Sequence, residues 1–315
     1  MTNFWKTLEK PFFALAPMEA VTDVVFRKVV RSAAPADIYF SEFTNATGWV
    51  NAGSIAVGGR LDKSEEDSPI VAQLWGSIPE DIEKLSRYCQ EQGYDGIDIN
   101  MGCPDKSAIK SGGGAALIQN PDLAKQIIAS AKKSGLPVSV KTRLGFSKIE
   151  EYKEWLHFLL QQDIVALTIH LRTKSEMSKV PAHFELLPDI VKLKNEIAPK
   201  TFVIANGDIL DYRHGKQIID QTGVDGVMIG RGVFNNPFAF EKSPRTHTKK
   251  ELVSLLNSHL NLYDERDDAK RKFETLKRFF KIYIRDFDGA GSLRHELMQT
   301  TNTDEVRKLL NKLDV

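Results

Sequence analysis

Short runs of apolar and β-branched residues recur along the first three quarters of the chain and predict β-strands. Their starts lie 24 to 41 residues apart, which leaves room for one loop and one helix after each strand. Near-continuous hydrophobic strands that alternate with helices are typical of a parallel sheet covered on both faces. Eight units over about 230 residues therefore predict an α/β fold, a closed (β/α)8 TIM barrel, with a doubly wound open sheet as the less favoured alternative. The runs begin at Phe12, Ile38, Pro69, Gly96, Pro137, Ala166, Phe202 and Gly226.

The pattern changes after Pro237, where apolar residues follow helical spacing and no further strand is indicated. We expect helices over residues 251–262 and 271–284. A linker around Ser243-Pro244-Arg245 separates the two patterns. The sequence thus predicts a barrel domain over residues 1–242 and a small C-terminal all-helical domain over residues 243–315.

Composition and charge narrow the class of protein. The chain has 315 residues, 42% of them hydrophobic, and a formal net charge of +1. Its first ten residues lack the apolar run of a secretory signal, and no run reaches the roughly 18 apolar residues that a membrane span needs. Two cysteines cannot form a disulfide framework or, alone, a four-ligand zinc site. We therefore expect a soluble, cytoplasmic protein with reduced thiols, no membrane contact and no metal site.

Polar residues end every predicted strand, and in a (β/α)8 barrel these ends share the rim at which chemistry takes place. Taken singly, each has an ordinary explanation, since a histidine such as His170 is often a hydrogen-bonded core residue. Together they are more easily explained by a site, because every buried polar group in a core would need its own partner. The polar strand ends are Glu19, Glu42, Gln73, Asn100, Lys141 with Arg143, His170 with Arg172, Asn206 with Asp208, and Arg231.

Glycine-containing turns follow the last two predicted strands, at Asn206-Gly207-Asp208 and at Gly230-Arg231-Gly232. Backbone N–H groups and a guanidinium in such turns can surround an anion, and barrels often bind phosphate at this position. We therefore predict a phosphorylated ligand. The triple glycine at 112–114 is not part of a Walker loop, and no GxGxxG follows a strand, so neither nucleotide motif is supported.

Two further rim residues suggest redox chemistry. Lys141 could place a fixed positive charge beside an electron-accepting ring, as a lysine does when it stabilises a reduced flavin, and a lysine paired with a carboxylate is the alternative. Cys103 lies between Gly102 and Pro104 just past the fourth strand, which leaves open a reactive thiol or a turn that contains a cysteine. Cys89 falls within a helical pattern and is expected to be a small core residue.

Seven segments resemble, in order and spacing, the motifs of the tRNA-dihydrouridine synthase family. The resemblance covers about residues 12 to 240, and NMGCP with its downstream glycines is its most specific part. The helical segment agrees with the C-terminal tRNA-binding domain of that family in size and class only. The segments are APMEAVTD, QLWGSIPED, DINMGCPDKSAIKSGGGAALIQNP, VSVKTRLG, IHLRT, IANGDI and VDGVMIGRG.

The resemblance implies an oxidoreductase whose FMN-containing barrel reduces particular uridines of tRNA to 5,6-dihydrouridine with NADPH as the electron source. Flavin N5 would deliver a hydride to C6 of uracil, and an acid on the opposite face would protonate C5. A thiol with its usual pKa of about 8.5 is protonated at neutral pH, so Cys103 is the expected acid, with Lys141 and His170 as the other catalytic residues. By motif match the cofactor would be held by Pro17, Met18, Glu19, Gln73, Lys141, His170, Asn206, Gly207, Asp208, Gly230 and Arg231.

The same resemblance implies that the rim and the tail contact a tRNA substrate. Asn100 and Cys103 would face the uracil, and the target base would leave its stack to reach the flavin. From Ser243 onward 15 Lys and Arg stand against 12 Asp and Glu, although charges on an amphipathic helix are often only a solvated face. We expect the protein to be a monomer. The candidate substrate contacts are Asn100, Arg172, Arg271, Lys272, Lys277 and Arg278, with Lys281 and Arg285 as further basic residues of the tail.

Two positions depart from the family pattern. Ala20 stands where the family usually has glycine, and we expect the extra methyl group to be harmless. Leu171 also replaces a usual glycine, next to His170, and its bulk leaves open how that turn would admit a substrate.

Two other functions fit parts of the pattern. An FMN barrel that acts on a small molecule, such as a dihydroorotate dehydrogenase or an enone reductase, explains the flavin residues. This alternative gives the helical domain no function, and the NMGCP segment fits it poorly. A non-catalytic RNA-binding protein would not need Lys141, His170 and Cys103 together.

Overall fold

The computed structural model of the chain describes residues 3–266 and 272–313, without the side chains of residues 55 and 56. All eight predicted strands are present, and each pairs in parallel with its neighbours. A short additional strand, β3 (Thr44–Asn45), pairs with β4. The eight strands are β1 (Phe12–Leu15), β2 (Tyr39–Phe40), β4 (Ile70–Trp75), β5 (Gly96–Met101), β6 (Val138–Arg143), β7 (Ala166–His170), β8 (Phe202–Asn206) and β9 (Gly226–Ile229).

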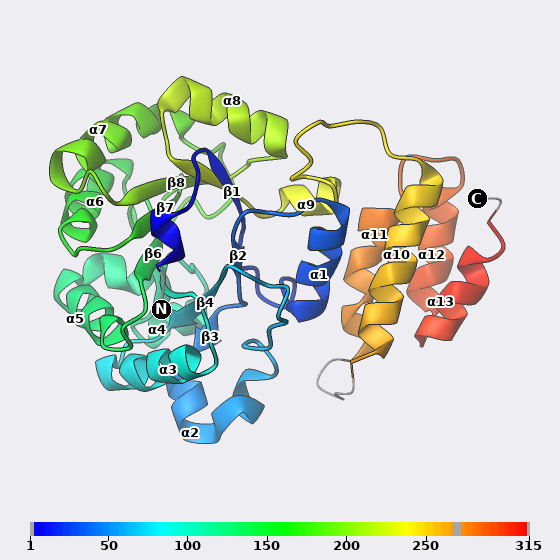
Figure 1. Cartoon of the computed structure of the whole chain (residues 1–315), viewed down its shortest axis with the longest axis horizontal. Helices are drawn as coiled ribbons and strands as arrows, with labels where there is room; N and C mark the ends of the chain where they lie inside the picture. Colours follow the sequence, from blue (N-terminus) through cyan, green and yellow to red (C-terminus); the bar gives the residue numbers. More distant parts are fainter. Residues whose placement is uncertain (1–2, 267–271, 314–315) are drawn as a thin grey trace.

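The sheet closes into a barrel. Hydrogen-bonded neighbours follow the order β1-β9-β8-β7-β6-β5-β4-β2. The two end strands meet because the Leu15 amide donates to Ile38 O at 3.0 Å and the Asp37 amide donates to Phe13 O at 2.8 Å. Figure 1 shows the strands enclosed by a ring of helices. The predicted (β/α)8 barrel is therefore confirmed.

Helices follow the strands and cover the outside of the barrel. α3 illustrates why they form where they do: Pro79 occupies its first position, Glu80 and Asp81 lie in its first turn, and Gly93 follows its end with φ +73°. Cys89 of this helix is fully buried in the core, as predicted. The helices of the barrel are α1 (Val24–Ala33), α2 (Ala46–Val57), α3 (Pro79–Glu91), α4 (Lys106–Lys110), α5 (Pro121–Lys132), α6 (Tyr152–Leu160), α7 (Leu187–Ile197), α8 (Tyr212–Thr222) and α9 (Gly232–Asn235).

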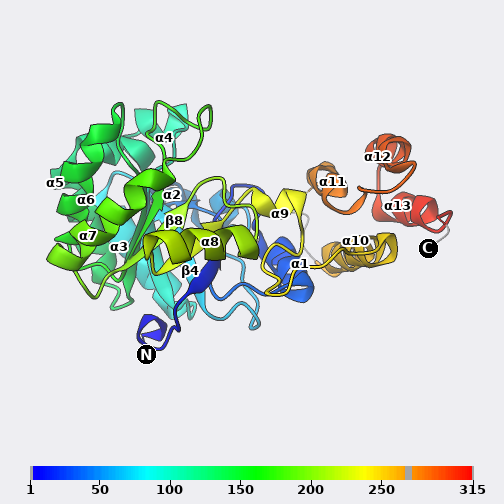
Figure 2. The same ribbon diagram turned by 90° about the horizontal axis from the view of Figure 1, so that it is seen from above.

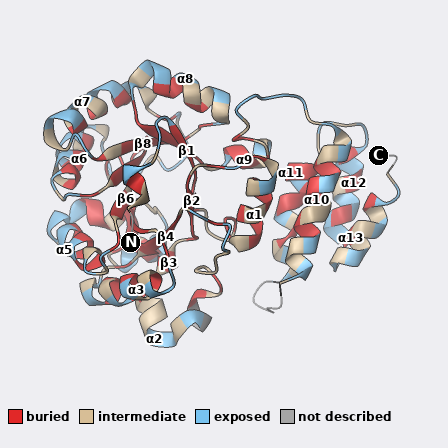
Figure 3. Cartoon of the chain, in the orientation of Figure 1, coloured by how far each residue is buried: buried red, intermediate tan, exposed pale blue. Residues whose placement is uncertain are grey.

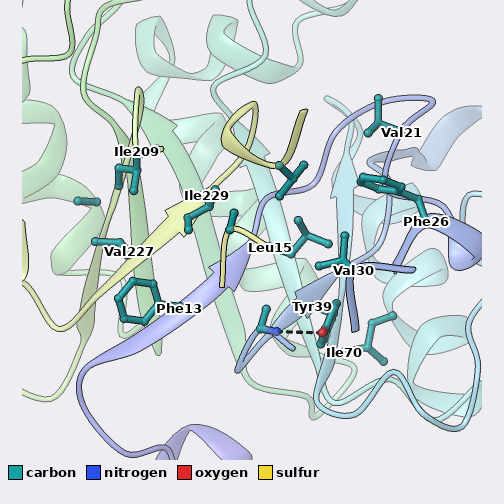
Figure 4. Packing of buried hydrophobic residues seen from close by; sticks show 14 of the residues in the cluster. Phe13, Leu15, Val21, Phe26, Val30, Tyr39, Ile70, Ile209, Val227 and Ile229 are labelled. Atoms are coloured by element: carbon teal, nitrogen blue, oxygen red, sulfur yellow. Dashed lines mark hydrogen bonds between the residues drawn. The ribbon is translucent and has the colours of Figure 1, made fainter. Parts of the chain in front are cut away.

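Strand β1 shows why the strands are nearly continuous apolar runs. Phe12 belongs to a cluster enclosed by the barrel. Phe13 belongs instead to the large outer cluster (Figure 4) and stacks on Tyr212 of α8, with the ring centroids 4.3 Å apart. Both faces of the strand are buried, so both need apolar side chains. Trp5 covers the N-terminal ends of the strands, with its ring 6.2 Å from Phe12 and 5.7 Å from Phe202. Exposed residues lie mainly on the outer faces of the helices (Figure 3). In a barrel of this kind a site is expected at the C-terminal ends of the strands.

The chain after the barrel is helical. The helix predicted over residues 251–262 is present as α10 (Lys249–Asp264), and α12 (Ala290–Gln299) and α13 (Thr303–Leu310) follow it. The single helix predicted over residues 271–284 is wrong for its described part, which forms two 3-10 turns and then α11 (Phe280–Tyr283). Phe279, the last residue of the second 3-10 turn, has its ring 4.8 Å from that of Phe26 on α1, so packing against the barrel overrides helical propensity here.

This helical segment lies beside α1 and α9 at one side of the barrel (Figure 2). The Arg266 guanidinium donates to the Asp62 carboxylate at 2.7 Å, and Arg278 Nη1 donates to Ala20 O at 3.0 Å. An irregular segment at residues 241–248 leads into α10. The domain boundary between residues 242 and 243 stays a prediction. No described helix is long and apolar enough to cross a membrane.

Candidate active site

Two cavities lie at the C-terminal rim of the barrel. The larger has a volume of about 670 Å³ and is bordered by the ends of β1, β6, β7, β8 and β9. The smaller, about 410 Å³, lies beside the ends of β3 and β4 and the turn after β5. Consecutive residues after β1 line them, Met18 the larger cavity and Glu19 the smaller. The larger cavity brings together Pro17, Met18, Lys141, His170, Asn206, Gly207, Asp208, Gly230 and Arg231, all of which were predicted from the sequence.

The glycine turns after β8 and β9 form one end of the larger cavity. Gly207 has φ +115°, a conformation that side chains other than hydrogen rarely permit. A Cβ at Gly230 would lie 3.4 Å from the Cβ of Ala16 and 3.7 Å from the Sδ of Met18, both of which border the cavity. Both positions therefore keep space and backbone N–H groups available to a ligand.

Asp208 links two arginines at this end. Its Oδ1 accepts a hydrogen bond from Arg231 at 3.0 Å, and its Oδ2 accepts one from Arg172 and another, at 3.1 Å, from the Ala182 amide. Burial acts to raise the pKa of Asp208, but the hydrogen bond and charge of Arg172 and the charge of Arg231 outweigh it, and the pKa lies below its usual value. Arg172 is only 2% exposed, so its guanidinium holds Asp208 from below the surface. The Arg231 side chain is 64% exposed and can reach an anion in the cavity.

Lys141 and His170 border the other end of the larger cavity. Lys141 Nζ has no hydrogen-bond or ion-pair partner among the described residues, and burial together with the charge of Arg143 lowers its pKa to about 8. His170 Nδ1 is buried and likewise lacks a partner in the part of the chain that the structure describes. Burial and the charges of Arg143 and Lys141 hold the pKa of His170 far below its usual value, so its imidazole is neutral. A polar ligand would satisfy both groups.

A buried chain of hydrogen bonds leads to the turn after β5. Gln73 Nε2 donates to Asp98 Oδ2 at 2.6 Å, and Asn100 Nδ2 donates to Gln73 Oε1 at 3.0 Å. Asn100 Oδ1 then accepts from the Cys103 amide at 2.9 Å and from the Gly102 amide at 3.1 Å. Asp98 was not predicted from the sequence, although its position two residues before Asn100 on one strand places both on the same face.

Cys103 is half-buried and borders the smaller cavity together with Trp75 and Glu19. Burial raises the pKa of its thiol. The downstream glycines support this turn: Gly114 has φ +56°, and a Cβ there would lie 2.9 Å from Cys103 O. The structure therefore places Cys103 next to the cavity of Lys141 and His170, but not inside it.

The basic residues of the tail occupy different places. Lys281 borders the larger cavity, with Nζ 5.2 Å from the ring of Phe234. Arg278 and Arg285 donate to backbone oxygens of the barrel, whereas Lys277 donates to Met298 O at 3.0 Å within the helical segment. Lys272 is exposed. Arg271 lies outside the described residues.

The structure clarifies both departures from the family pattern. Leu171 is fully buried in the core, with its amide donating to Asn206 O at 2.9 Å, and it borders neither cavity. Its bulk therefore leaves the cavity beside His170 free. Ala20 has φ +57°, the left-handed region in which a Cβ costs about 1 kcal/mol, so the expectation of a harmless methyl group overlooked a backbone strain.

Among the described residues, no group of three or more His, Cys, Asp or Glu side chains is arranged to hold a metal ion. The larger cavity instead offers unpartnered nitrogen donors and a cradle of N–H groups with a guanidinium, a donor set that suits a polar ligand carrying an anionic group.

Comparisons with known proteins agree with this geometry. The chain is similar in fold to a variant of NCR from Zymomonas mobilis (TM-score 0.51, 18% identity, 74% of this chain and 87% of that one). A similar likeness holds for histamine dehydrogenase from Rhizobium sp. 4-9 (TM-score 0.51, 11% identity, 79% and 48%). In sequence, this chain is 52% identical over 314 residues to the probable tRNA-dihydrouridine synthase 2 of Bacillus subtilis (strain 168), covering 99% of this chain and 97% of that protein.

The probable tRNA-dihydrouridine synthase of Staphylococcus aureus (strain COL) is also 52% identical over 314 residues, covering 99% of this chain and 96% of that protein. The model of the dihydrouridine synthase family matches residues 14–314, so the match includes the helical segment as well as the barrel. A barrel whose rim carries the expected glycine turns, lysine and thiol, and relatives aligned along nearly its whole length, lead to one conclusion: this chain belongs to the dihydrouridine synthase family.

Proposed function

We propose that this enzyme reduces uridines of tRNA to 5,6-dihydrouridine with FMN held in the larger cavity, NADPH as the electron source and Cys103 as the proton donor. The observation that carries the proposal is the division of the rim, with an anion cradle and unpartnered cationic and polar groups on one side and a protonated thiol on the other. Membership of the family, along the helical segment too, argues against the small-molecule oxidoreductase and the non-catalytic alternatives.

The residues of the larger cavity fit FMN. The N–H groups of the turns at Gly207 and Gly230, with Asn206 and the Arg231 guanidinium, would hold the phosphate. The Asp208 carboxylate would repel that phosphate if it touched it, and we assign it instead the task of orienting Arg172 and Arg231. The ring end would be held by Pro17, Met18, Lys141 and His170, with Gln73 beneath and Glu19 at the boundary of the two cavities.

When bound in the larger cavity, the flavin would supply a hydride for C6 of uracil. Lys141 contributes positive charge where the flavin ring gains electrons, and with a pKa of about 8 it is mostly protonated at pH 7. His170 is neutral and can hydrogen-bond to cofactor or substrate without adding charge.

Cys103 donates the proton that completes the reduction. Its raised pKa keeps the thiol protonated at neutral pH, which an acid requires. The S–H bond breaks as a C–H bond forms at C5 of uracil, and the thiolate that remains recovers a proton from solvent. The positive charges of Arg143 and Lys141 favour that thiolate during the step.

The tRNA would present its target base unstacked from its neighbours, since the rim residues lie below the protein surface. Lys272, Lys277 and Arg278 of the helical segment are the described candidates for phosphate contacts, and Asn100 is the candidate for the uracil. Arg172, predicted as a substrate contact, is almost wholly buried and donates to Asp208, so we assign it to the cofactor side instead. We further propose that the enzyme works as a cytoplasmic monomer without a metal.

Replacement of Cys103 by alanine tests this proposal. Cys103→Ala should bind FMN and be reduced by NADPH like the wild type, because its side chain is outside the larger cavity. Formation of dihydrouridine in a single turnover should fall by about 10²- to 10⁴-fold, the usual contribution of a general acid. Cys89→Ala removes the other thiol and is the matched control. Wild-type turnover in Cys103→Ala would remove the thiol from the mechanism.

A further inference from the structure

Asp98 is a buried carboxylate in an unusual environment. It lies on β5 at 0% exposure, and the described residues give it no ion-pair partner. Its two partners are neutral: Gln73 Nε2 donates to Oδ2 at 2.6 Å, and Ser139 Oγ donates to Oδ1 at 2.6 Å. Burial of a charge that has no ion-pair partner is unfavourable, because the charge loses its hydration. An apolar residue at this position would avoid that desolvation cost. Packing alone therefore does not explain why a carboxylate occupies this position.

The chemistry of the carboxylate determines how the neighbouring amides are oriented. An ionised carboxylate can only accept hydrogen bonds, so Gln73 must turn its Nε2 toward Asp98. Gln73 Oε1 then faces Asn100, which must offer Nδ2 to it, at 3.0 Å. Were either amide reversed, two N–H groups or two oxygens would face each other inside the barrel, where an unpaired buried polar group is costly.

The side-chain amide of Asn100, the second in this chain of hydrogen bonds, contacts the backbone of the proposed proton donor, Cys103. With Nδ2 directed at Gln73, Asn100 turns Oδ1 toward the amides of Gly102 and Cys103, which donate to it at 3.1 and 2.9 Å. The turn has little freedom on its other side, since a Cβ at Gly102 would lie 3.2 Å from the carbonyl carbon of Thr142 on β6. The position of the thiol is thus set by hydrogen bonds that begin at Asp98.

We propose that Asp98 is a positioning residue for proton transfer, whose buried carboxylate orients the Gln73 and Asn100 amides and through them holds the Gly102–Cys103 turn. This inference rests on the proposed role of Cys103 as the acid. Burial raises the pKa of Asp98 to about 6, against the hydrogen bonds from Ser139 and Gln73 and the charge of Lys141, so the carboxylate is mostly ionised at pH 7. Among the described residues, Lys141 is the titratable group whose charge acts on Asp98.

The same account predicts which substitution is tolerated. An asparagine can present Oδ1 to Gln73 and donate Nδ2 to Ser139, whose hydroxyl can turn toward Ile97 O, 3.5 Å away. Asp98→Asn should therefore preserve both amide orientations, whereas Asp98→Ala removes the acceptor. Ser139→Ala removes the other partner of Asp98 without touching the amides and is the matched control.

The experiment uses the full-length protein and two measurements. The first is the rate at which iodoacetamide alkylates Cys103 in the flavin-free protein, located by mass spectrometry. The second is single-turnover formation of dihydrouridine in tRNA after loading with saturating FMN and reduction by NADPH. Asp98→Ala should slow that turnover at least about tenfold, change the alkylation rate and leave flavin reduction by NADPH unaltered. Asp98→Asn and Ser139→Ala should stay within about threefold of the wild type, because the first amide keeps its acceptor in both.

Two results would overturn the inference: wild-type alkylation and turnover in Asp98→Ala, or an Asp98→Asn variant as impaired as Asp98→Ala. If Asp98→Ala does not accumulate as folded protein, Asp98→Ser fills more of the site, cannot span to Gln73, and should show the same losses. The proposed function fails separately, through wild-type turnover in Cys103→Ala. In that case the alkylation rates still show whether Asp98 positions the turn.

Discussion

The two sides of the barrel rim are built differently. Around β8 and β9 the side chains are charged, and two of the three are partly exposed: Asp208 lies between the buried Arg172 and the 64% exposed Arg231, beside a cavity of about 670 Å³. Around β4 and β5 the polar groups are two amides and one carboxylate with less than a tenth of their surface exposed, Gln73 and Asp98 at 0% and Asn100 at 6%. Under the proposed roles, charges that bind an anion must be accessible to it, whereas groups that position a thiol must be held in one orientation.

This difference suggests how one rim can serve two half-reactions. Ion pairs near the surface are readily exchanged for a phosphate, because solvent screens the cost of rearranging them. A hydrogen-bonded chain inside the barrel has no such freedom, since every unmade bond there leaves an unpaired polar group. A ligand can thus enter and leave one side without disturbing the other.

The largest effect expected on the anion side follows from loss of Arg231. Arg231→Ala removes a charged hydrogen-bond donor, and FMN affinity should fall about 10- to 100-fold, in proportion to the strength of such bonds. Titration with FMN and with riboflavin, which lacks the phosphate, measures the change. Arg213→Ala, on the exposed face of α8, is the control. Equal weakening of both ligands would mean that Arg231 does not contact the phosphate and would remove the contrast between the two sides.

A smaller effect should appear with pH. Lys141 is positively charged below its pKa of about 8 and neutral above it. Because the protonated form attracts the electron-rich edge of the flavin ring, FMN should bind about five- to tenfold more weakly at pH 9 than at pH 7. Fluorescence titration across this range is the measurement. Lys141→Met should abolish the pH dependence, and Cys103→Ala should retain it; a flat profile in the wild type would place Lys141 away from the ring.

The smallest effect concerns Ala20, at the boundary between the two cavities. Ala20→Gly relieves about 1 kcal/mol of left-handed strain but adds roughly 0.5 kcal/mol or more of chain entropy to the unfolded state. The free energy of unfolding should therefore rise by less than about 1 kcal/mol, as urea denaturation would show. Ala198→Gly, at φ −141°, has no strain to relieve and should be destabilised. A loss of stability in Ala20→Gly would mean that the turn carries no strain.

Much of the fold could be predicted from periodicity. All eight strands begin within a residue of their predicted starts, because each is apolar on both faces and is bounded by turn residues. The helix predicted over 271–284 is wrong for its described part because Phe279 packs against Phe26 of the barrel, a contact that local spacing does not encode. The strain at Ala20 was invisible for a similar reason, since φ depends on where the turn must lead.

Sequence by itself determined the barrel, the order of its strands and the polar residues that end them, because hydrophobic period and glycine position are local properties. Only the tertiary structure decided which of those residues share a cavity, that Arg172 is buried behind Asp208, and that Lys281 reaches the barrel rim. It also showed that Asp98 is joined to Cys103 through two amides. Those arrangements arise when the barrel closes, because a hydrogen bond between strands joins residues that are distant in the chain. The sequence around one such residue does not indicate which distant residue will be its partner.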